Sequence, residues 1–159
     1  YDGHAGVDYY MPENTPILAP APGSVVWSEF SPGADPCPGG MEPNGLTGII
    51  ILAHGNGYYS CYLHLNPPLN VVVGETVMIG DTLGFEGMTG CADQPHLHFE
   101  IRKDSWVFET DESYAVDPYA FMCEFDCKVL CELHYPSFRR GIWVESSTHT
   151  AGISNQAHD

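Results

Sequence analysis

Glycine and proline divide this chain into short apolar runs, and this feature limits the possible folds more than any other. The sequence has 17 glycines and 13 prolines in 159 residues, and the runs between them are rich in valine, isoleucine, tyrosine and phenylalanine. Such runs have the length of strands and lack the periodicity of long helices. The chain length fits one domain of ordinary size with its own core. We therefore expect a mostly β domain with many turns.

The turn residues also indicate where the strands lie. Segments 15–30, 46–65 and 70–90 each contain strand-length runs separated by glycine or proline. In the second segment, Asn56 and Gly57 stand between two apolar runs. An Asn-Gly pair in this position is typical of the turn of a β-hairpin.

Three sections of the chain differ in pattern. Residues 1–118 hold the strand-like runs and are expected to form one domain. Asp117 and Pro118 have the form of a helix N-cap and a first helical residue, so we expect a short helix to begin there. Residues 119–144 contain three cysteines and are expected to pack on the domain as a helical extension, and residues 145–159 are expected to form a polar tail or linker.

Segment 94–102, QPHLHFEIR, contains two histidines one residue apart inside a buried-strand pattern. Side chains in a strand alternate between faces, so His96, His98 and Glu100 are expected to share one face while the apolar residues between them join the core. Two imidazoles on one face are typical of a metal or catalytic site. A lone His-x-His pair also occurs as hydrogen-bonded structural histidines.

Two other segments supply candidate site residues. In HAGVD, three residues separate His4 from Asp8, and the glycines Gly3 and Gly6 favour an extended segment that places both side chains on one side. In YYSCYLHL, alternation predicts that His64 shares a face with Tyr62, opposite Cys61. Each histidine alone is more typical of a structural residue. In one β domain the polar faces of these segments can converge on one cleft. Together they can supply the three protein ligands that a catalytic zinc site needs.

The charge of the chain excludes several kinds of partner. Five basic residues against 21 acidic ones give a formal net charge of -16, and residues 1–101 contain no lysine or arginine. Binding to nucleic acid or to an anionic membrane depends on basic residues, so neither is expected. No segment approaches the roughly 20 apolar residues of a membrane span, so no membrane insertion is expected.

Six cysteines without a C-x-x-C pair favour disulfides and an oxidising compartment. Cys37 and Cys91 lie in two loops that a disulfide can join, and Cys61 fits a buried thiol as well as a disulfide. The other cysteines form one stripe if their segment is helical, and a second metal site with His134 is the weaker alternative to disulfides there. They are Cys123, Cys127 and Cys131.

Four segments, in this order, resemble the lysostaphin-type zinc metallopeptidases, which cut peptide cross-links of bacterial cell walls. They are GHAGVDYYMPENTPILAPAPGSVV, HGNGYYSCYLHL, VGETVMIGDTLGFEGMTG and QPHLHFEIR. The resemblance extends from residue 3 to Pro118. It implies the family's mostly β fold, a duplicated hybrid motif of antiparallel sheet in a sandwich or barrel-like form, with the metal in a groove on the sheet.

The resemblance also implies the roles of five side chains. It implies that His4, Asp8 and His98 bind one zinc ion and that His64 and His96 are catalytic. Two histidines and one carboxylate suit Zn²⁺, which can lower the pKa of a bound water to about 7. The two remaining imidazoles can take the water proton and stabilise the charge that develops on the substrate. The residues do not indicate which histidine takes the proton and which stabilises the charge.

The resemblance implies a zinc endopeptidase that hydrolyses peptide cross-links of peptidoglycan, and the cysteines favour a secreted, periplasmic or cell-wall-associated protein. The alternative is a non-catalytic metallopeptidase-like domain that binds the wall or regulates other wall hydrolases; the presence of all five site residues favours the enzyme. Leu63 stands where many members of the family have glycine, so the wall of the site is expected to differ in shape. Tyr62 is expected to pack or to add a hydrogen-bond donor, and His54 is expected to be structural.

Overall fold

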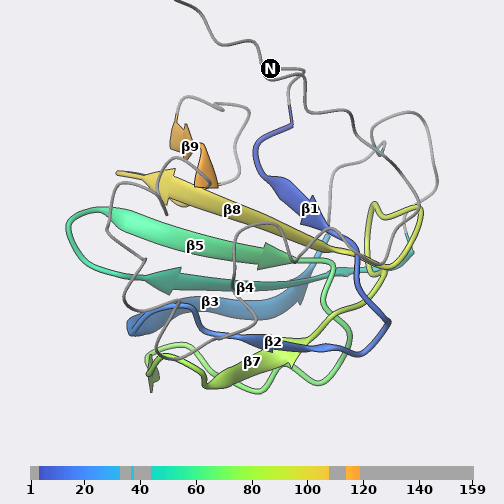
Figure 1. Ribbon diagram of the computed structural model, residues 1–159, viewed down its shortest axis with the longest axis horizontal. Coiled ribbons are helices and arrows are strands. Elements are labelled where there is room, and N and C mark those ends of the chain that lie inside the picture. The colour runs from blue at the N-terminus through green and yellow to red at the C-terminus, as the bar shows by residue number, and fades with distance from the viewer. Residues whose placement is uncertain (1–3, 33–36, 38–43, 108–113, 119–159) are drawn as a thin grey trace, which may run out of the picture.

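The computed structural model describes residues 4–32, 37, 44–107 and 114–118 of the chain. Within these residues, all named elements are β-strands (Figure 1). They are β1 (Val7–Tyr9), β2 (Pro16–Leu18), β3 (Gly23–Ser31), β4 (Thr47–Ala53), β5 (Tyr58–Leu63), β6 (Thr76–Val77), β7 (Thr82–Phe85), β8 (Leu97–Lys103) and β9 (Ala115–Val116). No helix in this part of the chain is long and apolar enough to cross a membrane.

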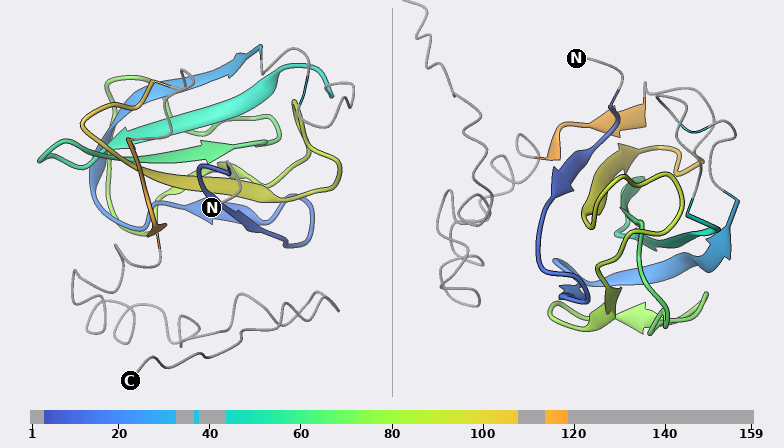
Figure 2. Two further views of the ribbon diagram at one scale, coloured as in Figure 1. Left: turned by 90° about the horizontal axis from the view of Figure 1, so that it is seen from above. Right: turned by 90° about the vertical axis from the view of Figure 1, so that its right-hand side faces the viewer.

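The strands form two antiparallel sheets. The larger has the order β1-β8-β5-β4-β3-β6, with β9 added beside β8, and the smaller consists of β2 and β7. Ile17 of β2 and Leu83 of β7 lie in the same buried cluster as Ile50 and Leu52 of β4, so the small sheet packs on one face of the large one (Figure 2). The expected mostly β, antiparallel fold is therefore confirmed.

The central strand β4 is covered on both faces. Ile50 and Leu52 point into the main core, while Ile49 and Ile51 belong to a second buried cluster with Cys61. Cys61 is a buried free thiol, so of the two expectations for this residue the thiol is confirmed. A strand buried on both faces reads as a continuous apolar run, which explains the sequence IIIL.

The β4–β5 hairpin confirms the turn predicted at Asn56 and Gly57. Both residues have positive φ, 49° and 75°, and the His54 amide donates to the Tyr58 carbonyl at 2.9 Å. The His54 ring is also fixed: Nδ1 donates to the Pro22 carbonyl at 2.8 Å, and Nε2 accepts from the Ser60 hydroxyl at 2.7 Å. These bonds support the structural role expected for His54.

The disulfide considered between Cys37 and Cys91 is present, and it closes a sequence separation of 54 residues. The predicted helix after Pro118, the remaining cysteines and the sections 119–144 and 145–159 lie outside the described residues.

Replacing Cys37 and Cys91 together by serine is expected to lower the free energy of unfolding by about 2–4 kcal/mol, because the link restricts a long loop of the unfolded chain. Urea unfolding followed by fluorescence measures the difference. Cys61→Ser is the matched control for loss of one buried sulfur. A double variant as stable as the parent would contradict this expectation.

Glu86, which follows β7, has a buried carboxyl group. Its exposed fraction is 0%, and among the described residues neither side-chain oxygen has a hydrogen-bond partner. Burial raises its pKa to about 7. The native state therefore keeps a proton that the unfolded chain releases, and the stability conferred by protonated Glu86 is lost as pH rises towards that value.

Glu86→Gln is accordingly expected to increase the free energy of unfolding at pH 8 by about 1–3 kcal/mol and to change it little at pH 5. Denaturant unfolding at both pH values measures this dependence. Glu29→Gln, which removes an exposed carboxylate of β3, is the control and is expected to have no such pH dependence. Equal effects of Glu86→Gln at the two pH values would show that Glu86 is ionised in the native state throughout.

Candidate metal centre

Three of the predicted site residues lie together where β1 pairs with β8. Asp8 is the direct cross-strand partner of His98, and its Oδ1 lies 2.9 Å from His98 Nδ1 and 3.3 Å from His4 Nε2. One ligand atom from each of the three side chains lies within 4.8 Å of the other two. Exposure of the side chains falls from 43% for His4 to 24% for Asp8 and 10% for His98, so the cluster opens on the His4 side.

Gly6 allows β1 to approach β8 this closely. A Cβ atom at this position would overlap the Phe99 carbonyl oxygen and would lie 2.9 Å from Glu100 Cγ and 3.0 Å from His98 Nε2. Real Cβ atoms essentially never approach other atoms so closely. The glycine between His4 and Asp8 is therefore required by the contact between the strands.

The electrostatics of the cluster follow from its contacts. Burial alone would raise the pKa of Asp8, but its hydrogen bond to His98 and the nearby histidines hold the pKa below its usual value. Burial alone would lower the pKa of His98, but hydrogen bonds to Asp8 and Glu100 raise it to about 9. Asp8 is thus an anion at neutral pH, and His98 without metal is a cation that must release a proton to become a ligand.

Glu100 and Arg102 continue the polar face of β8 beyond His98. Glu100 Oε1 accepts from His98 Nε2 at 3.0 Å, and Arg102 Nη1 donates to Glu100 Oε2 at 2.7 Å. The alternation of side chains in β8 predicts that Glu100 lies on this face but predicts none of its contacts, and Arg102 was not among the predicted site residues. The two-residue spacing from His98 to Glu100 and Arg102 was the signal that could have indicated the chain of contacts.

The His64 ring lies beside the site, but not in the position that strand alternation predicts. The prediction that His64 shares a face with Tyr62 is wrong: Tyr62 is 2% exposed, packs on Phe99 with ring centroids 5.4 Å apart, and exchanges a hydrogen bond with Ser60. His64 has φ of 67°, which interrupts the alternation after β5. Its ring lies 4.7 Å from that of His96 instead. Tyr62 therefore packs in the core and is not a donor to the site.

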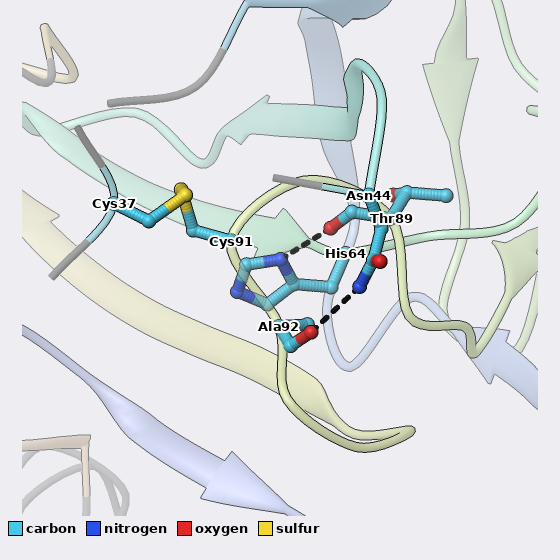
Figure 3. Close-up of a disulfide and its surroundings, with 6 residues drawn as sticks. All are labelled: Cys37, Asn44, His64, Thr89, Cys91 and Ala92. Carbon is cyan, nitrogen blue, oxygen red and sulfur yellow. Dashed lines mark hydrogen bonds between the residues drawn. A yellow bond between two sulfur atoms is a disulfide. The ribbon is translucent and has the colours of Figure 1, made fainter. Parts of the chain in front are cut away.

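A positive φ at a residue other than glycine costs of order 1–3 kcal/mol and needs support from its surroundings. The loop after β7 provides it. The Thr89 carbonyl accepts a hydrogen bond from His64 Nδ1 at 2.7 Å (Figure 3). The Thr89 hydroxyl donates to the Leu65 carbonyl at 2.9 Å. Two residues later, the Cys37–Cys91 disulfide fixes the same loop.

His64 and His96 are arranged alike. Each ring donates through Nδ1 to a backbone carbonyl, that of Thr89 for His64 and that of Gln94, at 2.8 Å, for His96. A carbonyl can only accept, so in the neutral rings Nε2 has the lone pair. His96 Nε2 lies 3.8 Å from Asp8 Oδ1, next to the cluster.

Burial lowers the pKa of His64 to about 4, although its bond to Thr89 and the charge of Asp8 act in the opposite direction. The ring is therefore neutral at neutral pH. Its Nε2 can accept a proton from a group placed between the two imidazoles and the cluster.

The donor set of the cluster fits a zinc ion. Neutral imidazole nitrogens and one carboxylate are ligands that Zn²⁺ prefers, and three protein ligands are typical of a catalytic rather than a structural site. Asp8 and His98 come from two adjacent strands, so the sheet pairing sets their separation, while His4 comes from the segment before β1.

Comparison with known proteins agrees with this geometry. Residues 2–118 match the family model of peptidase family M23. The chain belongs to this family. Its M23 fold resembles that of the catalytic domain of the antimicrobial peptidase lysostaphin from Staphylococcus simulans, with a TM-score of 0.60 and 32% identity over 76% of this chain and 79% of that one. The resemblance inferred from the four sequence segments is thus confirmed.

Two further relatives carry informative names. The peptidoglycan DD-endopeptidase ShyA of Vibrio cholerae is 35% identical over 98 residues, which cover 62% of this chain and 20% of the relative. A zinc-containing peptidase from Vibrio cholerae has a TM-score of 0.52 and 29% identity over 64% of this chain and 27% of that one. The chain thus spans about a fifth of the length of the first curated relatives that it matches.

Proposed function

We propose that this chain contains a zinc-dependent endopeptidase domain that hydrolyses peptide cross-links of bacterial peptidoglycan. The observation that supports it most is the placement of two buried imidazoles, both with Nδ1 bonded to the backbone, beside a three-residue His-Asp-His cluster. A structural metal site needs no such pair, because its ion is enclosed by four protein ligands. In this proposal His4, Asp8 and His98 hold one zinc ion, and His64 and His96 are catalytic.

A zinc ion in this place supplies Lewis-acid chemistry, which lowers the pKa of water and polarises a peptide carbonyl. The chain itself supplies the proton transfers. One Nε2 of the His64–His96 pair accepts the proton of the attacking water and passes it to the leaving amine. The other Nε2, with a proton taken up from solvent, donates a hydrogen bond to the oxyanion. The backbone bonds of both Nδ1 atoms keep the rings in the orientation and tautomer that these steps need.

The substrate and location follow from the relatives and from the disulfide. ShyA is named a peptidoglycan DD-endopeptidase, and lysostaphin an antimicrobial peptidase. A structural disulfide such as Cys37–Cys91 is typical of proteins in an oxidising compartment and supports this location. We accordingly propose that peptidoglycan peptides are the substrate and that the domain acts outside the cytoplasm, as a secreted, periplasmic or wall-associated protein.

The domain limits are part of the proposal. The proposed limits of the peptidase domain are residues 1–118, and the sections 119–144, which contains three cysteines, and 145–159 are proposed to lie outside it. The match of residues 2–118 to the family model supports the first limit.

Hydrolysis of purified peptidoglycan tests the proposal. With zinc, we expect soluble peptide fragments that mass spectrometry can assign to cross-link cleavage; chelation is expected to reduce their release to background, and added zinc to restore it. Walls with different cross-links identify the bond that is cut. A zinc-loaded chain that binds the wall and leaves every peptide intact would contradict the proposal and favour a wall-binding module.

A further inference from the structure

Glu100 is a buried charged residue that the proposed chemistry does not use. It lies in β8, two residues after His98, and is 3% exposed, while Arg102 on the same face is 2% exposed. Burying a carboxylate and a guanidinium is costly unless both are paired and hydrogen-bonded. This ion pair lies next to His98, one of the three residues of the His-Asp-His cluster, and this position indicates a role for the pair.

Both carboxylate oxygens of Glu100 accept hydrogen bonds. Oε1 lies 3.0 Å from His98 Nε2, and Oε2 lies 2.7 Å from Arg102 Nη1. The other ring nitrogen of His98, Nδ1, points to Asp8 at 2.9 Å. The two ring nitrogens therefore face different surroundings: Nδ1 the cluster with His4 and Asp8, and Nε2 the interior of the protein.

Arg102 fixes the orientation of Glu100. Its Nε donates to the Ser105 carbonyl at 3.3 Å, and its Nη2 donates to the Val107 carbonyl at 3.1 Å. An arginine has only donors, so the Glu100 oxygen that faces it must accept. The positive guanidinium thus stabilises Glu100 as a carboxylate, and a carboxylate can only accept the hydrogen bond that His98 Nε2–H donates.

We propose that Glu100, held by Arg102, is a positioning residue that keeps the proton of His98 on Nε2 and thereby presents the lone pair of Nδ1 to the metal. The inference rests on the metal site of the proposed function and not on its substrate. A carboxylate that receives the second N–H of a histidine ligand fixes the ring orientation and makes the ligand nitrogen more basic. Loss of such a partner typically weakens metal binding by about 10–100-fold.

The first test needs no variant. In the zinc-loaded full-length chain, ¹⁵N NMR of the histidine rings reports which nitrogen of each ring has the proton and which binds the metal. We expect His98 to have its proton on Nε2 and its metal bond at Nδ1. A metal bond at Nε2, or a proton on Nδ1, would overturn the proposal, since Glu100 would then not set the tautomer.

The second test is the zinc affinity of Glu100→Gln, measured by competition with a chromophoric chelator. The glutamine amide has one accepting oxygen, so its NH₂ group must face either His98 or Arg102, both of which need an acceptor. We therefore expect zinc binding about 10–100-fold weaker than in the parent. Glu29→Gln on β3 has the same charge change on an exposed side chain and is expected to bind zinc like the parent.

A structural role and a positioning role give different results. If Glu100 only stabilises the fold, Glu100→Gln lowers the unfolding temperature but the folded variant binds zinc as tightly as the parent, which would overturn the inference. If the variant does not fold, the ring NMR of the parent still decides.

The outcomes also separate this inference from the proposed function. A parent chain that binds zinc, is weakened by Glu100→Gln and cuts no wall peptide would contradict the peptidase function alone. A parent chain that does not bind zinc would overturn both.

Discussion

Asp8→Asn is expected to remove zinc binding at micromolar metal and to lower peptidoglycan hydrolysis by about 10³-fold. Asp8 is the one anion of the cluster, and its Oδ1 lies within 3.3 Å of both histidines. The amide has the same shape and lacks the charge, so the metal loses its only anionic ligand. Lewis-acid stabilisation contributes several kcal/mol, and each 1.4 kcal/mol corresponds to about a factor of ten in rate.

Zinc content by elemental analysis and fragment release by mass spectrometry are the two measurements for Asp8→Asn. Asp104→Asn is the matched control: the same change of side chain at a residue that is 68% exposed and whose positive φ of 66° asparagine also tolerates. We expect this control to retain both zinc and activity. If Asp8→Asn retained stoichiometric zinc and activity within about tenfold of the parent, Asp8 would not be a ligand.

His64→Ala and His96→Ala are each expected to lower hydrolysis by about 10²–10⁴-fold while the zinc content stays at one ion per chain. Both rings lie beside the cluster and have Nε2 available for proton transfer, but neither belongs to the His-Asp-His set. Retention of zinc with loss of activity is the result that separates a catalytic histidine from a ligand.

His54→Ala is the matched control for these two variants. Its ring nitrogens bond to Pro22 and Ser60, away from the site, so we expect a loss of stability with little change in activity per folded molecule. Loss of zinc in His64→Ala or His96→Ala would assign that residue to the metal instead. Activity within threefold of the parent in both variants would exclude the proposed proton transfers.

Much of the fold could be predicted because it depends on local rules. The apolar alternation of β8 places Leu97, Phe99 and Ile101 in the core, and the Asn56-Gly57 turn forms the predicted hairpin. Both features require only the geometry of a strand and the φ values that a tight turn demands. The sequence therefore contained enough information for these elements.

Less of the candidate site than of the fold could be predicted from the sequence. The five histidine and aspartate residues could be proposed from their motifs, but the contacts of Glu100 with His98 and Arg102 could not, because side-chain alternation gives a shared face and not a distance. Nor could the buried carboxyl of Glu86 be predicted, since the backbone of Glu86 pairs with that of Asn14 and Thr15, which are distant in sequence.

The strand pattern, the hairpin, the polar face of β8 and the residue types of a zinc site follow from the order of the residues. For His64, the direction of the ring depends on contacts between distant parts of the chain. Its backbone adopts a left-handed conformation that the strand pattern does not predict, and a carbonyl from a loop 25 residues further along the chain holds the ring in place. Such a conformation is unfavourable for an isolated chain and persists only when distant contacts offset its cost.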